Sequence, residues 1–322
     1  MHHYSLLQIL ADGQLHSGTE LADAVGVSRT AVWKQLQHLE ALGLELETVR
    51  GHGYRLSAPL DLLSEEGVRA EWPPALSDRI SLDVRTEVDS TNQALMALPA
   101  LARDYQVCIA EQQTQGRGRR GRTWGSPFAR NIYLSLAFET EGAMQAIQGV
   151  TLVAGVALAQ ALESSGITGI SLKWPNDIWL NGRKIAGILT ELQGAVQDRF
   201  RLVIGVGLNV YMSESEADID QPWTSLSREQ QVPIGGRDRL AGTLIAQLVD
   251  WLEVSGGIGS AAFRSAWARY DALAGQPVSV QGKALNGVAR GIDEAGHLRV
   301  VTDDGLEQHL SAGEVSIRVG SL

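Results

Sequence analysis

Residues 116–124 read GRGRRGRTW and place four arginines and three glycines ahead of a tryptophan, in a chain whose formal net charge is −10. A segment this basic in an acidic chain needs a local reason. Glycine lets the backbone approach a ligand closely, and arginine offers forked donors to phosphate or carboxylate oxygens. The segment therefore predicts a loop that closes over a phosphorylated ligand, with Trp124 offering its ring to a flat base.

The glycines of this loop also constrain the fold. Gly116, Gly118 and Gly121 satisfy the GxGxxG spacing of dinucleotide-binding domains, a pattern that is weak on its own. That fingerprint needs a strand before it and a helix that opens at the third glycine. Residues 106–111 predict the strand, but residues 123–127 read TWGSP, which is typical of a turn. The sequence therefore excludes a Rossmann domain here and leaves a solvated basic loop without a ligand as the alternative.

Bulk composition limits the location and partners of the chain. Its 322 residues suffice for two or three domains, and its single cysteine, Cys108, cannot form an internal disulfide. The N-terminus lacks the basic-then-apolar pattern of a secretion signal, and the longest apolar stretch, residues 150–162, is too short for a membrane span. We expect a cytoplasmic protein. Because the net charge is negative, any DNA binding must rest on a local surface.

Residues 1–62 predict a winged helix-turn-helix domain that binds DNA. Three helices are expected, over residues 5–11, 17–24 and 29–42. Ser17 and Ser28 are the predicted N-caps, and Gly26 makes the turn. Residues 44–56 alternate around the sequence RGHG and predict a hairpin wing.

The third helix carries the candidate DNA contacts. Its outward-facing residues are of types that contact phosphates and base edges, namely Ser28, Arg29, Thr30, Trp33, Lys34 and Gln37. Residues 1–60 nevertheless contain four Lys or Arg against six Asp or Glu, so the domain is not basic overall. Three-helix modules with wings also serve as protein-contact domains, and that alternative stays open.

Two further domains are predicted, which makes the fold class multidomain α+β. Residues 63–271 alternate helices with strands and predict an α+β domain with a mainly antiparallel or mixed sheet. Its clearest local signal is Asn181-Gly182, which predicts a hairpin between two strands. Residues 272–322 lose helical periodicity and predict a small β-barrel or sandwich. Its five strands are expected over residues 277–280, 284–292, 297–302, 306–310 and 315–319.

Two polar clusters accompany the loop at residues 116–124, which we call the arginine loop. Residues 90–92 read STN at the predicted start of a helix, where hydroxyls, an amide and free N–H groups can bind the polar head of a small ligand. An ordinary capped helix is the alternative. Residues 173–177 read KWPND and present Asn176 and Asp177 after a proline. A carboxylate beside an amide suits Mg²⁺ or a ribose, although a plain turn explains this motif equally well.

A third cluster starts at Lys184, the first residue of an apolar strand. A lysine facing inward there is a poor structural choice unless an anion pairs with it. Gly187, with Gly205 and Gly207 in the next strand, predicts a floor where a ligand packs against backbone, and Asn209 is placed to add an amide contact. No catalytic triad and no zinc-ligand spacing is present, so no covalent intermediate and no protein-bound metal are predicted. The clusters describe a site for a carboxylate and a nucleoside triphosphate.

The motifs GRGRRG (116–121), KWPND (173–177) and KIAGIL (184–189) together closely resemble those of the biotin protein ligases. With the N-terminal winged helix, the chain is similar to the bifunctional bacterial branch of that family, whose members also repress the biotin operon. The resemblance covers all three predicted domains in order. It implies an SH3-like barrel for residues 272–322, which assists contacts with ATP and the carrier protein.

The resemblance implies an ATP-dependent, AMP-forming biotin–protein ligase. Biotin and MgATP would give biotinyl-5′-AMP and pyrophosphate, and a lysine of the biotin carboxyl carrier protein of acetyl-CoA carboxylase would then attack the mixed anhydride. The resemblance also implies binding to operator DNA, as a homodimer when biotinyl-AMP is bound, and no membrane partner.

The family's functional positions carry over residue by residue. Those that hold biotin match Ser90, Thr91, Asn92 and Gln113; the loop that orders over the ligand matches Arg117, Gly118 and Arg119; and those near the nucleotide match Arg122, Trp124, Asn176 and Asn209. Lys184 matches the lysine at the carboxylate and α-phosphate, and Trp124 is expected against adenine. Asp177 is the candidate to take the attacking lysine's proton. The resemblance thus implies that Lys184, Arg119 and Asp177 carry catalysis.

Three other interpretations stay open. Lipoate ligases share the central fold and a lysine with a related role, but the intact arginine loop and the KWPND motif favour biotin. A transcriptional sensor that binds biotin or its adenylate without transferring it would not need Lys184 or the loop arginines. A scaffolding protein would leave Gly187, Gly205 and Gly207 unexplained.

Overall fold

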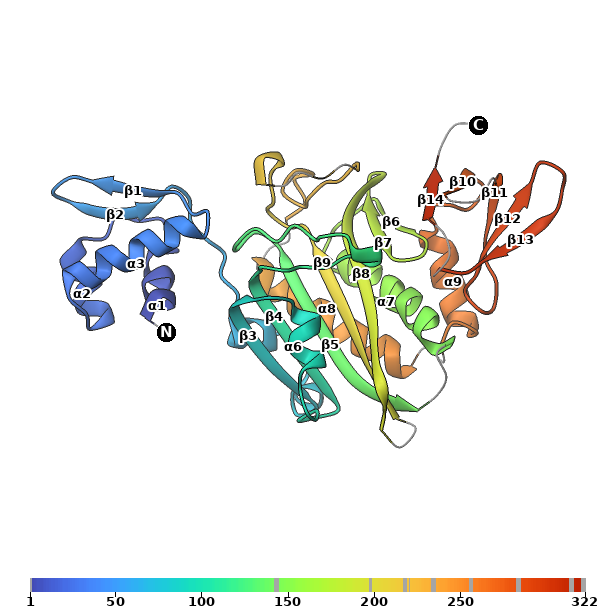
Figure 1. Cartoon of the computed structure of the whole chain (residues 1–322), viewed down its shortest axis with the longest axis horizontal. Coiled ribbons are helices and arrows are strands. Elements are labelled where there is room, and N and C mark those ends of the chain that lie inside the picture. Colours follow the sequence, from blue (N-terminus) through green and yellow to red (C-terminus); the bar gives the residue numbers. More distant parts are fainter. Residues whose placement is uncertain are drawn as a thin grey trace.

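The computed structural model of this chain describes residues 2–141, 145–196, 199–216, 219, 221–232, 236–254, 257–281, 285–312 and 316–319. Figure 1 shows three lobes in sequence order, with the N-terminal and C-terminal lobes at opposite ends of a larger central one. No helix within these ranges combines the length and the apolar character that a membrane crossing requires.

The N-terminal lobe has the three helices and the hairpin that the sequence predicts. Its elements are α1 (His2–Leu10), α2 (Gly18–Val25), α3 (Arg29–Ala41), β1 (Leu46–Val49) and β2 (Gly53–Leu56). The Ser17 hydroxyl accepts a hydrogen bond from the Glu20 N–H at 3.1 Å, and the Ser28 hydroxyl accepts one from the Ala31 N–H at 3.2 Å. Both predicted N-caps are therefore confirmed. Gly26 has a φ of 69°, the left-handed conformation that ends α2 and makes the turn.

This lobe has its own core and also packs against the central lobe. Buried leucines from its helices, including Leu6, Leu21 and Leu36, form the core. Phe128 of the central lobe belongs to the same cluster and is only 3% exposed. The Tyr4 hydroxyl donates to the Leu63 carbonyl oxygen at 3.2 Å. The lobe therefore contacts the segment that follows the arginine loop.

The central lobe is built on a seven-stranded sheet, which is mixed and mainly antiparallel, as the sequence predicts. Its strands are β3 (Ile80–Val88), β4 (Tyr105–Gln113), β5 (Ile132–Glu141), β6 (Ile170–Lys173), β7 (Asp177–Leu180), β8 (Arg183–Val196) and β9 (Arg199–Leu208). They are ordered β3-β4-β5-β9-β8-β7-β6. Only the β3–β4 pair is parallel, and the other neighbours are antiparallel. The edge strand β3 was not predicted from the sequence.

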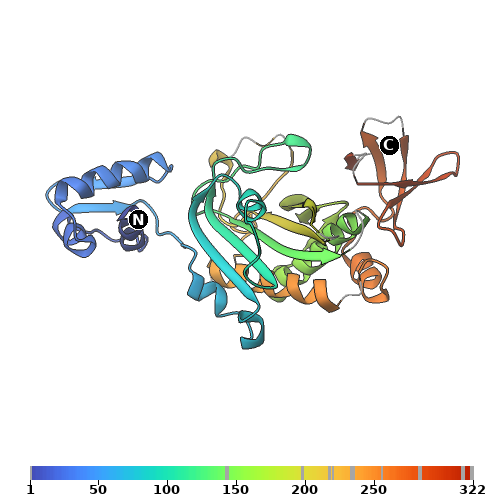
Figure 2. The same ribbon diagram turned by 60° about the horizontal axis from the view of Figure 1, so that its bottom comes forward.

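The two faces of this sheet are covered differently (Figures 1 and 2). The long helices α7 (Gln145–Ser164) and α8 (Gly236–Val254) cover one face, and the short α6 (Thr91–Met96) lies on the other. Alternation along β4 explains this arrangement. Val107 and Ile109 join the core under α7 and α8, whereas Cys108 between them packs with Leu95 of α6. The smaller helices are α4 (Glu65–Arg69), α5 (Pro74–Ser77) and α9 (Ala261–Tyr270).

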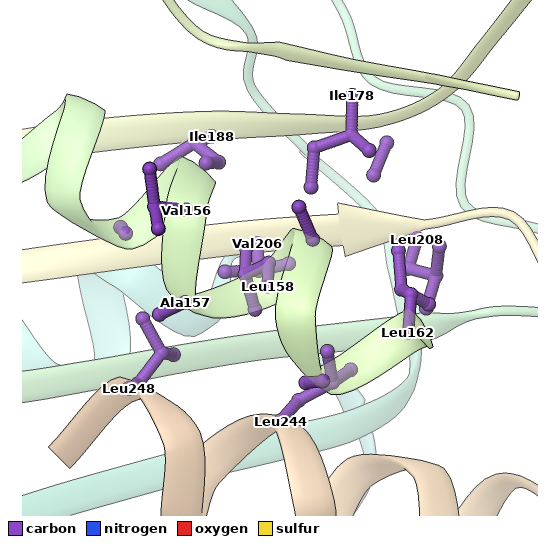
Figure 3. Close-up of a cluster of buried hydrophobic side chains, with 14 of the residues drawn as sticks. Val156, Ala157, Leu158, Leu162, Ile178, Ile188, Val206, Leu208, Leu244 and Leu248 are labelled. Carbon is purple, nitrogen blue, oxygen red and sulfur yellow. The ribbon is translucent and has the colours of Figure 1, made fainter. Parts of the chain in front are cut away.

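Helix α7 is apolar on more than one side because it lies between the sheet and α8. Figure 3 shows Val156 lying toward Ile188 of β8, and Ala157 toward Leu248 of α8. Leu158 is fully buried in the same cluster. The apolar stretch 150–162, which is too short for a membrane span, is thus part of a helix that packs between the sheet and α8.

A buried ion pair fixes the junction between the N-terminal and central lobes. The Glu111 carboxylate lies 2.6 Å from the Arg237 guanidinium, and both side chains are fully buried. Glu111 also accepts from the Leu63 N–H at 2.6 Å, and Arg237 donates to the Asp61 carbonyl oxygen at 2.8 Å. Burial raises the pKa of Glu111, and the charge of Arg237 opposes that shift. The pair therefore anchors residues 61–63, which connect the two lobes.

The C-terminal lobe contains the five predicted strands. They are β10 (Pro277–Gln281), β11 (Leu285–Ile292), β12 (Leu298–Thr302), β13 (Glu307–Leu310) and β14 (Ser316–Val319). The expectation of an SH3-like barrel is not confirmed. The order is β13-β12-β11-β10-β14, and β13 does not pair with β14 within the described strands, so the sheet is open. Barrel closure would require those two outer strands to pair.

Candidate active site

The predicted site residues converge on one cavity of about 170 Å³ in the central lobe. Among its lining residues are Ser90, Thr91, Asn92, Gln113, Arg117, Gly118, Arg119, Arg122, Trp124, Asn176, Asp177, Lys184, Gly187, Gly205 and Gly207. The cavity is strongly basic, because six Lys or Arg side chains line it and, among its described lining residues, Asp177 supplies the one carboxylate. Such a cavity attracts an anionic ligand.

Lys184 and Asp177 form an ion pair inside the cavity. The Lys184 Nζ lies 2.7 Å from the Asp177 Oδ1, and the two side chains are 14% and 15% exposed. Asp177 begins β7 and Lys184 is near the start of β8, and the turn Asn181-Gly182 joins the two strands. Both turn residues have positive φ, as the predicted hairpin requires. The anion that the sequence analysis required beside Lys184 is therefore supplied by the chain itself.

Trp124 lies against the backbone of two strands. A Cβ at Gly207 would lie 2.4 Å from the indole Cε2, and a Cβ at Gly187 would lie 3.0 Å from its Cζ3. The Lys184 Nζ is 5.5 Å from the centre of the ring, a cation–π distance. A Cβ at Gly205 would similarly meet the amide of Asn92. These glycines make room for side chains of the site, and their contact with a ligand stays a prediction.

The arginine loop is held across the cavity by Arg119. One Nη of Arg119 donates to the Asn176 Oδ1 at 2.9 Å, and the other donates to the carbonyl oxygen of Ala312 in the C-terminal lobe. The Asn176 amide in turn donates to the Ile188 carbonyl oxygen at 3.1 Å. Burial, followed by the charge of Arg120, lowers the pKa of the Arg119 guanidinium. The loop is thus tied to the KWPND motif and to the last lobe.

The polar end of the cavity is formed where α6 begins. Ser90, Thr91 and Asn92 are each 3% exposed. The Gln113 Oε1 accepts a hydrogen bond from the Thr91 N–H at 2.9 Å. A side chain of β4 therefore bonds to the backbone at the start of α6. The Gln113 Nε2 lies 3.3 Å from the Ser126 Oγ. Uncharged donors and acceptors therefore gather where α6 begins.

Asn209 is the one predicted cofactor contact that does not line the cavity. It follows β9, is 2% exposed, and donates from Nδ2 to the Thr224 carbonyl oxygen at 3.0 Å. The Thr224 N–H donates to the Lys184 carbonyl oxygen at 2.8 Å. Asn209 therefore supports the segment beside Lys184, and its direct contact with a nucleotide stays a prediction.

The six predicted DNA contacts lie between the N-cap of α3 and Gln37 in its second half. All of them are exposed, namely Ser28, Arg29, Thr30, Trp33, Lys34 and Gln37. Trp33 is 50% exposed, which is unusual for so large an apolar side chain. Their placement is compatible with a contact surface, and the contact with DNA itself stays a prediction.

Sequence reasoning missed three residues that the site uses. Gln221 lines the cavity, Ser135 bonds to Thr91 and Asn92, and Glu191 bonds to Asn92. Ser135 stands in the apolar strand segment 132–138, and a lone hydroxyl there is a usable signal. Nothing local marks Glu191, because its partner Asn92 is distant in sequence, and nothing local marks Gln221.

The comparisons with known families agree with this architecture. Residues 85–209 match the Biotin/lipoate A/B protein ligase family, residues 2–55 match an HTH domain, and residues 274–318 match the Biotin protein ligase C terminal domain. The fold and the site therefore define a ligase of the biotin and lipoate class.

Relatives narrow the class. The bifunctional ligase/repressor BirA of Escherichia coli (strain K12) is 38% identical over 97% of this chain and 96% of its own length. The biotin--[acetyl-CoA-carboxylase] ligase of Mycobacterium tuberculosis is 35% identical over 81% of this chain and 97% of its own. A solved biotin protein ligase from Aquifex aeolicus, in complex with biotin and ATP, matches with a TM-score of 0.60 and 27% identity, over 74% of this chain and 99% of that one. The chain belongs to the biotin protein ligases of the bifunctional ligase/repressor type.

Proposed function

We propose that the chain activates biotin with ATP and transfers it to a lysine of a biotin carboxyl carrier protein. The observation that carries the proposal is the cavity itself, which is lined both by the uncharged side chains of Thr91 and Gln113 and by Lys184 and the loop arginines. A ligand with a neutral ring head and a carboxylate tail fits that combination. The triphosphate fits the six basic side chains.

In the first step, the biotin carboxylate oxygen attacks the α-phosphorus of ATP. A bond forms between them, and the bond from that phosphorus to the pyrophosphate oxygen breaks. Phosphoryl transfer is catalysed mainly by positioning and by charge stabilisation. Lys184 stands where it can hold both oxygens together, and Arg117, Arg119 and Arg122 can balance the developing charge. Trp124 would receive the adenine ring, and Asn176 and Asn209 support that end.

In the second step, the amine of the carrier lysine attacks the acyl carbon of biotinyl-5′-AMP. An amide bond forms, and the bond between the acyl carbon and the AMP oxygen breaks. The amine must lose a proton in this step. Asp177 is the carboxylate available, and it becomes free to accept when Lys184 turns from it to the acyl phosphate. The ion pair therefore couples the two steps.

Magnesium would arrive with ATP. Mg²⁺ prefers oxygen ligands and usually keeps several waters beside one or two carboxylates and the phosphates. Within the described residues, no group of three or more His, Cys, Asp or Glu side chains could hold a metal by itself. Asp177, which lines the cavity, fits this limited role, in which the phosphates would hold most of the ion. Bound Mg²⁺ would neutralise charge on the phosphate oxygens.

The repressor role is assigned to the N-terminal lobe. The exposed start of α3 would contact operator DNA, and a homodimer loaded with biotinyl-AMP would present two such helices. We take residues 1–62, 63–271 and 272–322 as the DNA-binding, catalytic and C-terminal domains. We assign the last of these an SH3-like role in contacts with ATP and the carrier. With a carrier protein and DNA as partners, the protein would work in the cytoplasm.

Biotin-dependent exchange of labelled pyrophosphate into ATP tests the first step directly. We expect exchange with biotin and none with lipoate. Exchange supported by lipoate instead would assign the chain to the lipoate ligases. Biotin binding without any exchange would leave a biotin-sensing repressor.

A further inference from the structure

Ser135 lies buried between two residues of the polar end of the cavity. It is fully buried in β5, and its Oγ lies 2.7 Å from the Thr91 Oγ1 and 2.6 Å from the Asn92 Oδ1. Ser135 is not among the residues that line the cavity. Any effect that it has on a ligand must therefore pass through Thr91 or Asn92.

The amide of Asn92 is oriented from its other side. Its Nδ2 donates to the Glu191 carboxylate at 2.7 Å and to the Leu189 carbonyl oxygen at 3.2 Å. A backbone carbonyl and an ionised carboxylate can only accept, so the NH₂ group must face them. The Asn92 Oδ1 is then the atom that faces Ser135. A Cβ at Gly205 would lie 2.3 Å from this Oδ1, so a glycine is needed there for the amide to fit.

Counting protons sets the direction of the hydrogen bonds. The Asn92 Oδ1 carries no proton, so the single Ser135 proton must point to it. Ser135 has no second proton, so the Thr91 hydroxyl must donate to the Ser135 Oγ. The other acceptor within reach of Thr91, the Gln113 Oε1 at 3.1 Å, then receives only the Thr91 N–H. That oxygen keeps one lone pair for a ligand.

We propose that Ser135 and Glu191 are positioning residues that give this end of the cavity acceptor polarity, so that it selects a ligand head carrying N–H donors. The acceptors offered are the Gln113 Oε1 and the Thr91 Oγ1, both on residues that line the cavity. The inference rests on the proposed function and deepens it, because the ureido ring of biotin carries two N–H groups.

Loss of the Ser135 hydroxyl reverses this polarity. In Ser135→Ala, the Thr91 proton turns to the Gln113 Oε1 and takes the lone pair that a ligand N–H would use. Loss of Glu191 weakens the same arrangement, because only the Leu189 carbonyl oxygen then holds the Asn92 NH₂ group away from Ser135. Both variants should therefore weaken binding of an N–H donor specifically.

Calorimetric titration of the full-length chain tests this, with biotin and with an analogue in which one ureido N–H is replaced by N–CH₃. We expect Ser135→Ala to raise the Kd for biotin about tenfold, which corresponds to the loss of one hydrogen bond. The ratio of the Kd for the analogue to the Kd for biotin should fall by a similar factor. Glu191→Ala should act in the same direction. Because both belong to one chain of bonds, the double variant should lose little more than either single variant. In turnover, KM for biotin should rise while kcat stays within about twofold.

The matched control is Ser81→Ala on β3, which removes the acceptor of the Gln106 Nε2 at 3.0 Å and does not touch the cavity. Its Kd for biotin should match that of the wild type. The inference is overturned if Ser135→Ala behaves like Ser81→Ala, if it weakens both ligands equally, or if the two losses multiply in the double variant. Pyrophosphate exchange by the wild type tests the ligase function separately. A chain that binds biotin with this preference but shows no exchange would support the positioning role of Ser135 and Glu191 and would reject the ligase function.

Discussion

The Asp177 carboxylate lies 2.7 Å from the Lys184 ammonium nitrogen, so the chain itself supplies an anion that pairs with the lysine of the site. A lysine this enclosed is costly unless an anion compensates it. Asp177 meets that requirement, and substrate oxygens that replaced it beside Lys184 would meet it in turn. The exchange of one anion for another links substrate binding to release of the carboxylate.

Lys184→Ala should reduce adenylate formation by about 100- to 1,000-fold, the usual effect of removing one charge-stabilising donor. Pyrophosphate exchange measures this effect. The control is Arg183→Ala at the preceding residue. The Arg183 side chain is 44% exposed and forms an ion pair with Glu229. That variant should retain exchange, because Arg183 does not line the cavity. Its partner Glu229 is only 9% exposed, so a lower melting temperature is expected, and exchange is scored per folded protein. Equal loss in both variants would reject the role of Lys184.

Arg119→Gly should let biotinyl-AMP escape before transfer. Arg119 joins the loop to Asn176 and to the carbonyl oxygen of Ala312, and glycine would break both ties. Free adenylate labels any exposed lysine, so a bystander protein should become biotinylated. The measurement is label on that bystander, with Arg103→Gly as a control arginine outside the cavity. Bystander labelling at the wild-type level would show that Arg119 does not retain the adenylate.

Gly207→Ala should displace Trp124, because the new Cβ would lie 2.4 Å from the indole. Stacking of a base on an aromatic ring contributes about 1–3 kcal/mol, so we expect KM for ATP to rise about tenfold or more. KM for biotin should change much less. The matched control is Gly194→Ala on β8, where the new Cβ would have no atom within 4 Å. An unchanged KM for ATP would separate Trp124 from nucleotide binding.

His16 should make the stability of the N-terminal lobe depend on pH. Burial lowers the pKa of His16, but hydrogen bonds with the Glu20 and Asp12 carboxylates more than offset it, so the pKa is raised. The added stability is therefore complete below the unfolded value of about 6.5 and is lost as the pH rises through the folded pKa. Hydrogen exchange of α2 amides above about pH 6.5 measures the loss. His16→Gln should remove this pH dependence, whereas the exposed control His52→Gln should keep it.

Local signals explain which parts of the fold were predicted. Ser17, Ser28 and the turn Asn181-Gly182 act within a few residues of themselves, so the sequence indicates their structure directly. Strand β3 was missed because it is an edge strand that carries charged residues, and because its partner β4 is a parallel, non-local neighbour. The expectation of a barrel is not confirmed, and the sequence could not decide it, because closure depends on how the two outer strands meet, which no single strand encodes.

The site also has features that the sequence indicates and features that it does not. The motifs indicated which side chains line the cavity, because each motif keeps its members close in sequence. They did not indicate that Trp124 covers Gly187 and Gly207, or that Arg119 reaches Ala312 in another lobe. Such contacts join segments that only the folded chain brings together. The hydrogen bonds that join Ser135 to Thr91 and Asn92 are also of this kind.

Transfer of biotin to a carrier protein tests the central claim most directly. The full-length chain would be mixed with labelled biotin, MgATP and a biotin carboxyl carrier domain, and acid-stable label on the carrier would be scored. We predict ATP-dependent label on the carrier lysine that excess lipoate does not reduce and that Lys184→Ala nearly abolishes. Biotin binding with no label on the carrier would contradict the ligase account. The protein would then be a biotin sensor that acts through its winged helix.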